Sequence, residues 1–194
     1  MKLGIMQPYF FPYLGYFDLI NYTDQWIVFD TAQYIRHGWV NRNRILHPNE
    51  GWMYISVPVK QHAQDAAIKD IEIANDQNWK RSILGKLAHY KNQAPYGSET
   101  VDLVKNCSSF HEDSLSRLNV YALDKICERL GIDFDYVFFS EMDLNLGLIE
   151  DPGDWALRIS EAVGADEYAN PPGGVDLFDE EAFADSGIKL TIRN

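Results

Sequence analysis

The order of predicted elements restricts the fold of this chain more than any other feature. Apolar segments of strand length predict strands over 2–6, 25–29, 134–140, 166–170 and 188–192. Between them, apolar residues at helical spacing predict helices over 14–22, 154–163 and 179–186. Alternation of strand and helix is typical of a mainly parallel sheet with helices on both faces. The sequence therefore predicts an α/β, Rossmann-like fold.

The middle of the chain interrupts this alternation. Residues 43–46 and 53–59 read as two strands around the turn HPNEG, which predicts an inserted β-hairpin over about 41–60. A short strand is expected over 68–73. Helices over 78–90 and 113–130 form a helical subregion of about 76–131. With 194 residues and 22.3 kDa, the chain suits one domain, 1–194, that carries these insertions.

The net charge of -12 argues against nonspecific binding of nucleic acid, which needs a surplus of Lys and Arg. Residues 1–60 nevertheless carry +1, which leaves -13 for the remainder. An anionic small molecule would therefore bind to the first third of the chain.

The two cysteines, Cys107 and Cys127, lie on helical patterns, without a CxxC pair and without histidines at zinc-binding spacing. We interpret them as buried thiols of a reducing cytosol, and we predict no metal site. We find no signal peptide and no apolar run that could span a bilayer, so we expect a cytoplasmic protein.

The segment QPYFFPYLGY, residues 7–16, follows the first predicted strand. In doubly wound sheets, ligands bind beyond the carboxyl ends of the strands, close to the place where the strand order reverses. We therefore nominate Gln7, Tyr9 and Tyr13 for substrate binding and Tyr16 for catalysis, because their amide and hydroxyl groups can bond to a base or sugar. Packing in the core is the competing interpretation of the three tyrosines.

The segment WVNRNR, residues 39–44, alternates arginine with asparagine. On a strand, Arg42 and Arg44 share one face and Asn41 and Asn43 the other. Guanidinium groups bind phosphate or carboxylate in pairs of hydrogen bonds, so we assign all four residues to substrate binding. The alternative is an edge strand whose charges only prevent aggregation.

Five further residues complete the predicted site. Asp30 ends the second strand and His37 is the histidine nearest the arginines, so both are candidates for catalysis. Lys60 follows the second hairpin strand and is a candidate for the same anionic substrate. Gly173 and Gly174 follow a strand, and their backbone N–H groups could cradle an anion unless they only form a tight turn. No activated serine or cysteine is evident, which favours catalysis by positioning and electrostatic stabilisation.

The pattern P-x-F-x-P-x-x-G-x-x-x-L-I after a strand resembles the opening of the nucleotidylyltransferase superfamily, which includes pantothenate synthetase. Those enzymes carry an HxGH motif where this chain reads Tyr13-Leu14-Gly15-Tyr16. The histidines stabilise charge on the transferred phosphate, whereas a phenol donates one hydrogen bond without a full charge. The resemblance thus implies binding of a nucleotide or phosphate and leaves the use of ATP open.

A second resemblance covers nearly the whole chain. Its motifs are MQPYFFPYLGYFDLI, WIVFDTAQYIRHGWVNRNRI, SVPVK and GADEYANPPGG, and in this order they resemble the WbqC-like protein family. The chain departs from the family pattern at Ser140-Glu141, where members often have two serines, and it stops where members often continue. The family occurs beside genes for polysaccharide and O-antigen biosynthesis, and its members are often described as glycine or aminoacyl transferases.

This resemblance implies a transferase that joins a glycyl-type or other acyl unit to the amine of a nucleotide-linked amino sugar, or an ATP-dependent carboxylate-amine ligase. The alternative is a noncatalytic protein that binds a nucleotide sugar or another small ligand. The expected partner is an anionic small molecule rather than a nucleic acid. The sequence leaves the cofactor, the role of ATP and the formation of a homo-oligomer open.

Overall fold

The computed structural model describes residues 1–193, which form two compact units. Unit 1 comprises residues 1–6, 13–29 and 131–193, and unit 2 comprises residues 7–12 and 30–130. The chain therefore passes between the units after Met6, Pro12, Phe29 and Leu130. The single domain expected from the chain length stays a prediction.

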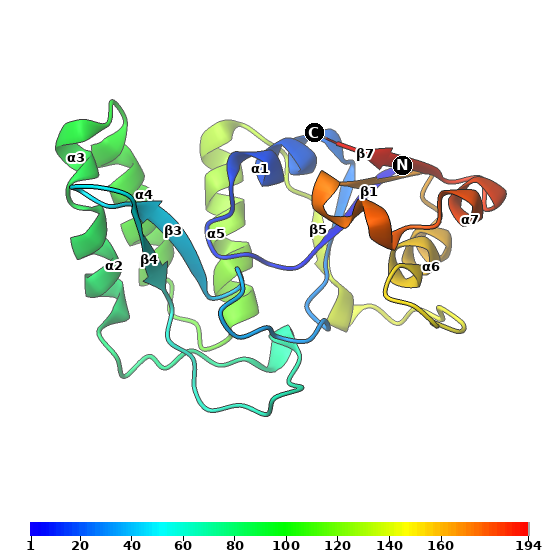
Figure 1. Ribbon diagram of the computed structural model, residues 1–194, viewed down its shortest axis with the longest axis horizontal. Coiled ribbons are helices and arrows are strands. Elements are labelled where there is room, and N and C mark those ends of the chain that lie inside the picture. Colours follow the sequence, from blue (N-terminus) through cyan, green and yellow to red (C-terminus); the bar gives the residue numbers. More distant parts are fainter. Residues whose placement is uncertain (194) are drawn as a thin grey trace. The chain divides into compact units, whose positions relative to one another are not determined.

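Unit 1 is built on a five-stranded sheet with the order β5-β2-β1-β6-β7, in which every neighbouring pair is parallel (Figure 1). The strands are β1 (Lys2–Met6), β2 (Gln25–Val28), β5 (Tyr136–Phe138), β6 (Glu167–Asn170) and β7 (Lys189–Ile192). From β1 the chain builds outward to β2 and β5, then crosses to β6 and β7 on the other side. This is a Rossmann-like order, and it confirms the predicted α/β fold.

The centre of this sheet depends on a glycine. Gly4 lies on β1 opposite Trp26 of β2, and a Cβ at Gly4 would come within 2.6 Å of the indole ring. The absence of a side chain lets Trp26 pack over the central strand, where 1% of its surface is exposed. This packing also determines the environment of Tyr16, described below.

Helices α1 (Leu14–Tyr22), α6 (Asp154–Val163) and α7 (Glu180–Asp185) complete unit 1. Helix α6 buries an apolar stripe and is capped at its C-terminus by Gly164, whose φ of 68° is the left-handed conformation that glycine tolerates. Helix α7 is capped at its N-terminus by Asp179, whose carboxylate accepts hydrogen bonds from the backbone N–H groups of Glu181 and Ala182. Two 3-10 helices, η2 (Phe139–Glu141) and η3 (Pro172–Leu177), follow β5 and β6.

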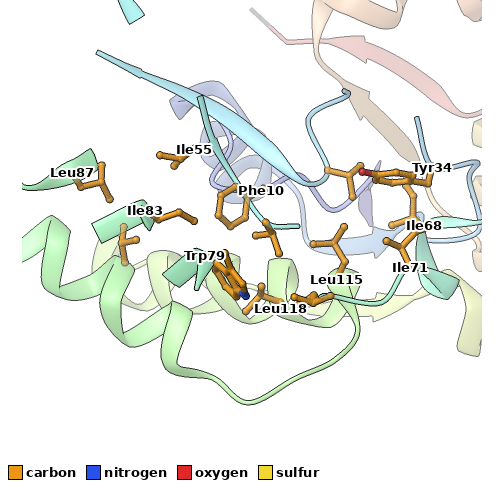
Figure 2. Packing of buried hydrophobic residues seen from close by; sticks show 14 of the residues in the cluster. Phe10, Tyr34, Ile55, Ile68, Ile71, Trp79, Ile83, Leu87, Leu115 and Leu118 are labelled. Atoms are coloured by element: carbon orange, nitrogen blue, oxygen red, sulfur yellow. The ribbon is translucent and has the colours of Figure 1, made fainter. Parts of the chain in front are cut away.

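Unit 2 contains the predicted hairpin and the helical subregion (Figure 1). Strands β3 (Arg42–Leu46) and β4 (Trp52–Ser56) pair antiparallel. The helices are α2 (Trp79–Leu87), α3 (Tyr90–Gln93), α4 (Gly97–Ser109) and α5 (Leu115–Leu130). Figure 2 shows Phe10 in the apolar core of this unit, among Ile55 of β4, Ile83 of α2 and Leu118 of α5.

Two parts of unit 2 differ from the sequence predictions. Residues 68–73 were expected to form a strand, but Ile68–Asp70 is a 3-10 helix, η1, and the residues around it make only isolated bridges such as Val59 with Ile73. Helix α4 lies within the predicted helical subregion but was not predicted as an element. Its glycine, serines and threonine have low helix propensity, and packing of Val101 and Val104 in the core favours the helix instead.

Candidate functional site

In unit 1, the strand order reverses between β1 and β6. Ligands of doubly wound sheets bind beyond the carboxyl ends of the strands at such a reversal. The segment after β6 contains Gly173 and Gly174 in η3, and the helix that follows β1 in unit 1 is α1, which begins after Tyr13. The carboxyl edge of β1 and β6 is thus a candidate nucleotide site, and Tyr13, Gly173 and Gly174 belong to the segments that border it.

The two tyrosines of the YLGY motif have different environments. Tyr13 precedes α1 and 56% of its surface is exposed. Tyr16 is 1% exposed, and its ring lies 5.2 Å from that of Trp26. Tyr16 therefore packs in the core of unit 1, and of the two tyrosines of the motif Tyr13 is the one accessible to a solute.

A buried asparagine fixes the segment after β6. Asn170 donates from Nδ2 to the carbonyl oxygen of Pro171 at 2.7 Å, and its Oδ1 accepts from the hydroxyl of Tyr168 at 2.9 Å. Burial raises the pKa of Tyr168, so this phenol stays protonated as a donor. A Cβ at Gly174 would lie 2.8 Å from the same Nδ2, so glycine at this position lets the backbone pass close to Asn170.

In unit 2, two side-chain amides hold the loop 7–12. Asn43 of β3 donates from Nδ2 to the carbonyl oxygens of Phe10 at 3.1 Å and Phe11 at 2.6 Å. Asn119 of α5 donates from Nδ2 to the carbonyl oxygens of Pro8 at 2.8 Å and Val40 at 2.7 Å. The loop therefore lies beside β3 and α5, and the amide of Asn43 supports the loop instead of pointing freely at a substrate.

Two residues of unit 2 that are not glycine have a positive φ: Phe11 at 44° and His37 at 64°. Each such conformation costs about 1–2 kcal/mol. The carbonyl oxygen of Phe11 accepts from Asn43, and that of His37 accepts from Nη2 of Arg42. Two neighbouring side chains of β3 thus hold two strained loops in place.

Arg42 and Arg44 lie on one face of β3, as predicted, together with Tyr54 and Trp52 of β4. The guanidinium carbon of Arg42 lies 4.0 Å from the ring centre of Tyr54. The guanidinium carbon of Arg44 lies 5.3 Å from the ring centre of Trp39 and 5.1 Å from that of Trp52. Within residues 1–193, neither arginine forms an ion pair with a carboxylate.

The other nominated residues of unit 2 have varied environments. Lys60 is exposed and its Nζ lies 2.6 Å from a carboxylate oxygen of Glu72, a hydrogen bond that raises the pKa of Lys60. Asp30 is 2% exposed and its carbonyl oxygen accepts from the N–H of Lys69. The imidazole of His37 is exposed and makes no hydrogen bond with the residues described here. The charge of Lys60 is thus partly neutralised. Asp30 is buried, so the chain around it would have to open before its carboxylate could contact a substrate.

The remaining nominated residues lie on or beside the loop 7–12. Gln7 and Tyr9 are half-buried, and Tyr9 packs against the core of unit 2. Asn41 donates from Nδ2 to the carbonyl oxygen of Val57 at 3.0 Å, while its buried Oδ1 accepts no hydrogen bond within residues 1–193. Asn41 therefore anchors the chain after β4 and keeps one unused acceptor.

Both cysteines are free and buried, which confirms the interpretation as buried thiols. Burial raises the pKa of Cys107 to about 11 and that of Cys127 to about 12. Thiols with such a pKa are almost entirely protonated at neutral pH and are poor nucleophiles. This agrees with the absence of a nucleophile motif in the sequence.

Across residues 1–193, His, Cys, Asp and Glu side chains form no group of three or more that could hold a metal ion. No helix in that range is both long and apolar enough to cross a membrane.

A small open hollow of about 280 Å³ lies at the start of α2 in unit 2. None of the nominated residues line it, and the residues that do are Asn75, Gln77, Asn78, Trp79, Lys80 and His111.

The sequence did not identify Asn119, Asn170, Trp52 or Tyr54 as parts of these sites. Asn119 lies four residues after Leu115 and four before Leu123, on the buried stripe of its helix. A polar residue on such a stripe needs hydrogen-bond partners, and this was the signal that could have identified it. Trp52 and Tyr54 would have followed from the register of the hairpin, which pairs Arg44 with Tyr54.

A model of the WbqC-like protein family matches residues 7–194. A protein of Mycobacterium tuberculosis (strain ATCC 25618 / H37Rv) with the name uncharacterized protein Rv1507c is 28% identical over 191 residues, which are 98% of this chain and 80% of that protein. No solved structure matches significantly.

Proposed function

Because the chain belongs to the WbqC-like protein family, we propose that it transfers an aminoacyl or another acyl unit to the amine of a nucleotide-linked amino sugar. The observation that supports this proposal most directly is the reversal of strand order between β1 and β6 in a wholly parallel sheet. Nucleotides bind at such reversals in doubly wound domains. The family association with surface polysaccharide supports a sugar nucleotide as the substrate.

The proposed reaction forms an amide. The amine nitrogen of the sugar attacks the acyl carbon, the bond from that carbon to the leaving group of an activated donor breaks, and the leaving group keeps the electron pair. The nitrogen loses a proton to a base. His37, exposed and without a hydrogen-bond partner within residues 1–193, is our candidate for that base, and Asp30 is the alternative.

Arg42 and Arg44 are the proposed phosphate-binding residues. They have no carboxylate partner within the described residues, although the protein carries a net charge of -12. Between Asp30 and Glu50 the chain contains no acidic residue. This stretch is therefore suited to an anionic substrate. Tyr13, Gly173 and Gly174 stay candidates for a separate nucleotide site at the carboxyl edge of the sheet of unit 1.

A second candidate function is the binding of a sugar nucleotide without catalysis. The observation that favours it is the burial of Tyr16, which leaves Tyr13 as the accessible polar side chain of the YLGY motif. A lone phenol cannot replace the charge that paired histidines supply to phosphate transfer.

Calorimetry with a panel of uridine and thymidine diphosphate amino sugars, followed by mass spectrometry for an N-acylated product with and without ATP, distinguishes the two functions. If the protein is a transferase, one donor should yield an N-acylated product. Binding of a sugar nucleotide without product under every donor condition supports the second candidate function, binding without catalysis. Arg42→Ala should abolish binding and product while the variant stays folded. Arg129→Ala is the matched control, because this arginine is exposed and paired with Glu99. Failure of every sugar nucleotide to bind would contradict both functions.

A further inference from the structure

The hairpin carries an unusual arrangement of arginine and aromatic side chains on its exposed face. The guanidinium carbon of Arg44 lies 5.3 Å from the ring centre of Trp39 and 5.1 Å from that of Trp52. Arg42 lies 4.0 Å over the ring of Tyr54. The rings of Trp52 and Tyr54 meet edge to face at 5.0 Å, so the aromatic side chains support one another as well.

Rings engage the flat face of a guanidinium group and leave the N–H groups at its edge available. Arg44 forms no hydrogen bond or ion pair through its side chain within residues 1–193. Arg42 uses Nη2 for the carbonyl oxygen of His37, and its buried Nε has no hydrogen-bond partner among these residues. Two guanidinium groups are therefore fixed in orientation while most of their donors remain unused.

Charges that only protect a strand edge from aggregation would point into water and need no aromatic support. Here one donor of Arg42 is buried without a partner, and an unpaired buried donor costs about 1–3 kcal/mol. Acidic residues are also absent between Asp30 and Glu50, so nothing on this stretch neutralises the two charges. These observations favour an anionic ligand over simple solvation.

We infer that Arg42 and Arg44 form a preorganised clamp for a diphosphate group, with Trp39, Trp52 and Tyr54 as positioning residues. Residues two apart on a strand lie about 7 Å apart, so two long side chains can converge on adjacent phosphates. The forked guanidinium donors match phosphate oxygens in pairs. Aromatic support restricts the side chains before the ligand arrives, which reduces the entropy lost on binding. The inference rests on the proposed function for the identity of the diphosphate as part of a sugar nucleotide.

The arginine test uses the full chain and inorganic pyrophosphate in titration calorimetry. Pyrophosphate should bind more tightly than inorganic phosphate. Arg42→Lys and Arg44→Lys should each weaken pyrophosphate binding about tenfold or more, because lysine keeps the charge but loses the fork. Arg129→Lys, a paired and exposed arginine of the same unit, should bind as the wild type does. Equal affinity in the Arg44→Lys and Arg129→Lys variants would overturn the clamp.

The aromatic test separates positioning from stability. Trp39→Leu and Trp52→Leu should each weaken pyrophosphate binding about two- to fivefold, as expected for loss of one exposed cation–π contact. Trp39→Phe should recover most of the affinity, because a ring remains under Arg44. Tyr96→Leu removes another exposed ring of unit 2 and should change nothing. Thermal unfolding of each variant identifies loss of fold, and unchanged affinity in folded Trp39→Leu and Trp52→Leu would refute the positioning role.

The clamp and the proposed transferase fail in different experiments. Pyrophosphate binding that depends on Arg42 and Arg44, together with no acylated product from any donor, would retain the clamp and reject the transferase. Product formation at the wild-type rate and with the wild-type KM for the sugar nucleotide in Arg44→Lys would reject the clamp and retain the transferase.

Discussion

Asn119 is the residue on which the loop 7–12 depends most. It is fully buried on α5, and its Nδ2 donates to the carbonyl oxygens of Pro8 and Val40. Val40 lies two residues before Arg42 of the proposed clamp, and Pro8 lies in the loop 7–12. A single amide therefore joins three segments of unit 2 that are far apart along the chain.

Replacement of Asn119 by leucine should destabilise the protein by about 2–4 kcal/mol. Leucine has a similar volume but leaves two carbonyl oxygens without their donor, and each unpaired buried group costs about 1–3 kcal/mol. Urea denaturation followed by circular dichroism measures the change in the free energy of unfolding. Asn106→Ala, at an exposed position of α4, should stay within about 0.5 kcal/mol of the wild type. A comparable loss in both variants would contradict a special role of Asn119.

For single residues, the sequence predicted which kinds of side chain share a face better than it predicted which neighbouring side chains contact them. The shared face of Arg42 and Arg44 follows from the two-residue period of a strand, and the hairpin shows it. Which rings stack on them depends on the register with β4, and Trp39 reaches Arg44 from outside the hairpin. The position of Tyr16 in the motif suggested an accessible side chain. In the structure Gly4 makes room for Trp26, and Tyr16 packs against Trp26.

Among the elements, α3 and α4 approach each other closely at a glycine. A Cβ at Gly97, the first residue of α4, would lie 1.9 Å from the carbonyl oxygen of Tyr90 on α3. No side chain fits there without a shift of backbone. Gly85 of α2, by contrast, has open space around the position of a Cβ.

These two glycines give a matched pair of helix substitutions. Gly97→Ala should destabilise the protein by about 1–3 kcal/mol, because backbone must move to relieve the overlap. Gly85→Ala should stabilise it by about 0.5–1 kcal/mol, because alanine favours the helix interior and loses less entropy on folding. Thermal unfolding should therefore shift in opposite directions for the two variants. A shift in the same direction would contradict the close approach of α3 and α4.

Elements were predictable where local signals and packing agree. The predicted bounds of β1, α1 and α6 equal those observed, since apolar periodicity and end signals coincide there. Helix α4 begins in GSET, which favours a loop by propensity, and forms because its apolar side has a core to cover. The isoleucines of residues 68–73 favoured a strand by their pattern, but η1 and the isolated bridges bury these side chains instead. No local pattern reports such tertiary partners.

Several carboxylates of unit 1 have a lowered pKa. A hydrogen bond from Arg193 lowers the pKa of Asp18. Hydrogen bonds from the backbone N–H groups of Asp151 and Glu150 lower the pKa of Asp154. All of these residues belong to unit 1.

Two further carboxylates of unit 1 have a lowered pKa. Arg158 and then Ser186 lower that of Glu161 through hydrogen bonds. For Glu167, burial acts to raise the pKa, but hydrogen bonds from Thr191, Tyr22 and Lys189 together outweigh it. Glu167 joins β6 to β7 and α1, so its ionised form supports the sheet edge of unit 1.

Unit 1 should therefore lose stability in acid. A carboxylate whose pKa is lower in the folded than in the unfolded state stabilises the fold fully above its ordinary pKa, which is 3.8 for Asp and 4.5 for Glu. The stabilisation decreases as the pH falls through the lowered value and each group takes up a proton. Hydrogen exchange read by mass spectrometry, corrected for the intrinsic effect of pH, should show peptides from 154–192 losing protection between about pH 5 and pH 3.

Glu167→Gln tests the largest of these networks, because glutamine keeps an acceptor oxygen for Tyr22 and Thr191 but does not titrate. This variant should have a shallower decrease of unfolding free energy between about pH 5 and pH 3 than the wild type, since one linked proton is removed from the transition. Asp176→Asn removes an exposed carboxylate of the same unit that makes no hydrogen bond within residues 1–193, and it should retain the wild-type slope. If the unfolding free energy of both variants depends on pH as that of the wild type does, Glu167 is not the source of the acid sensitivity of unit 1. The ion pairs of Asp18 and Glu161 must then account for it.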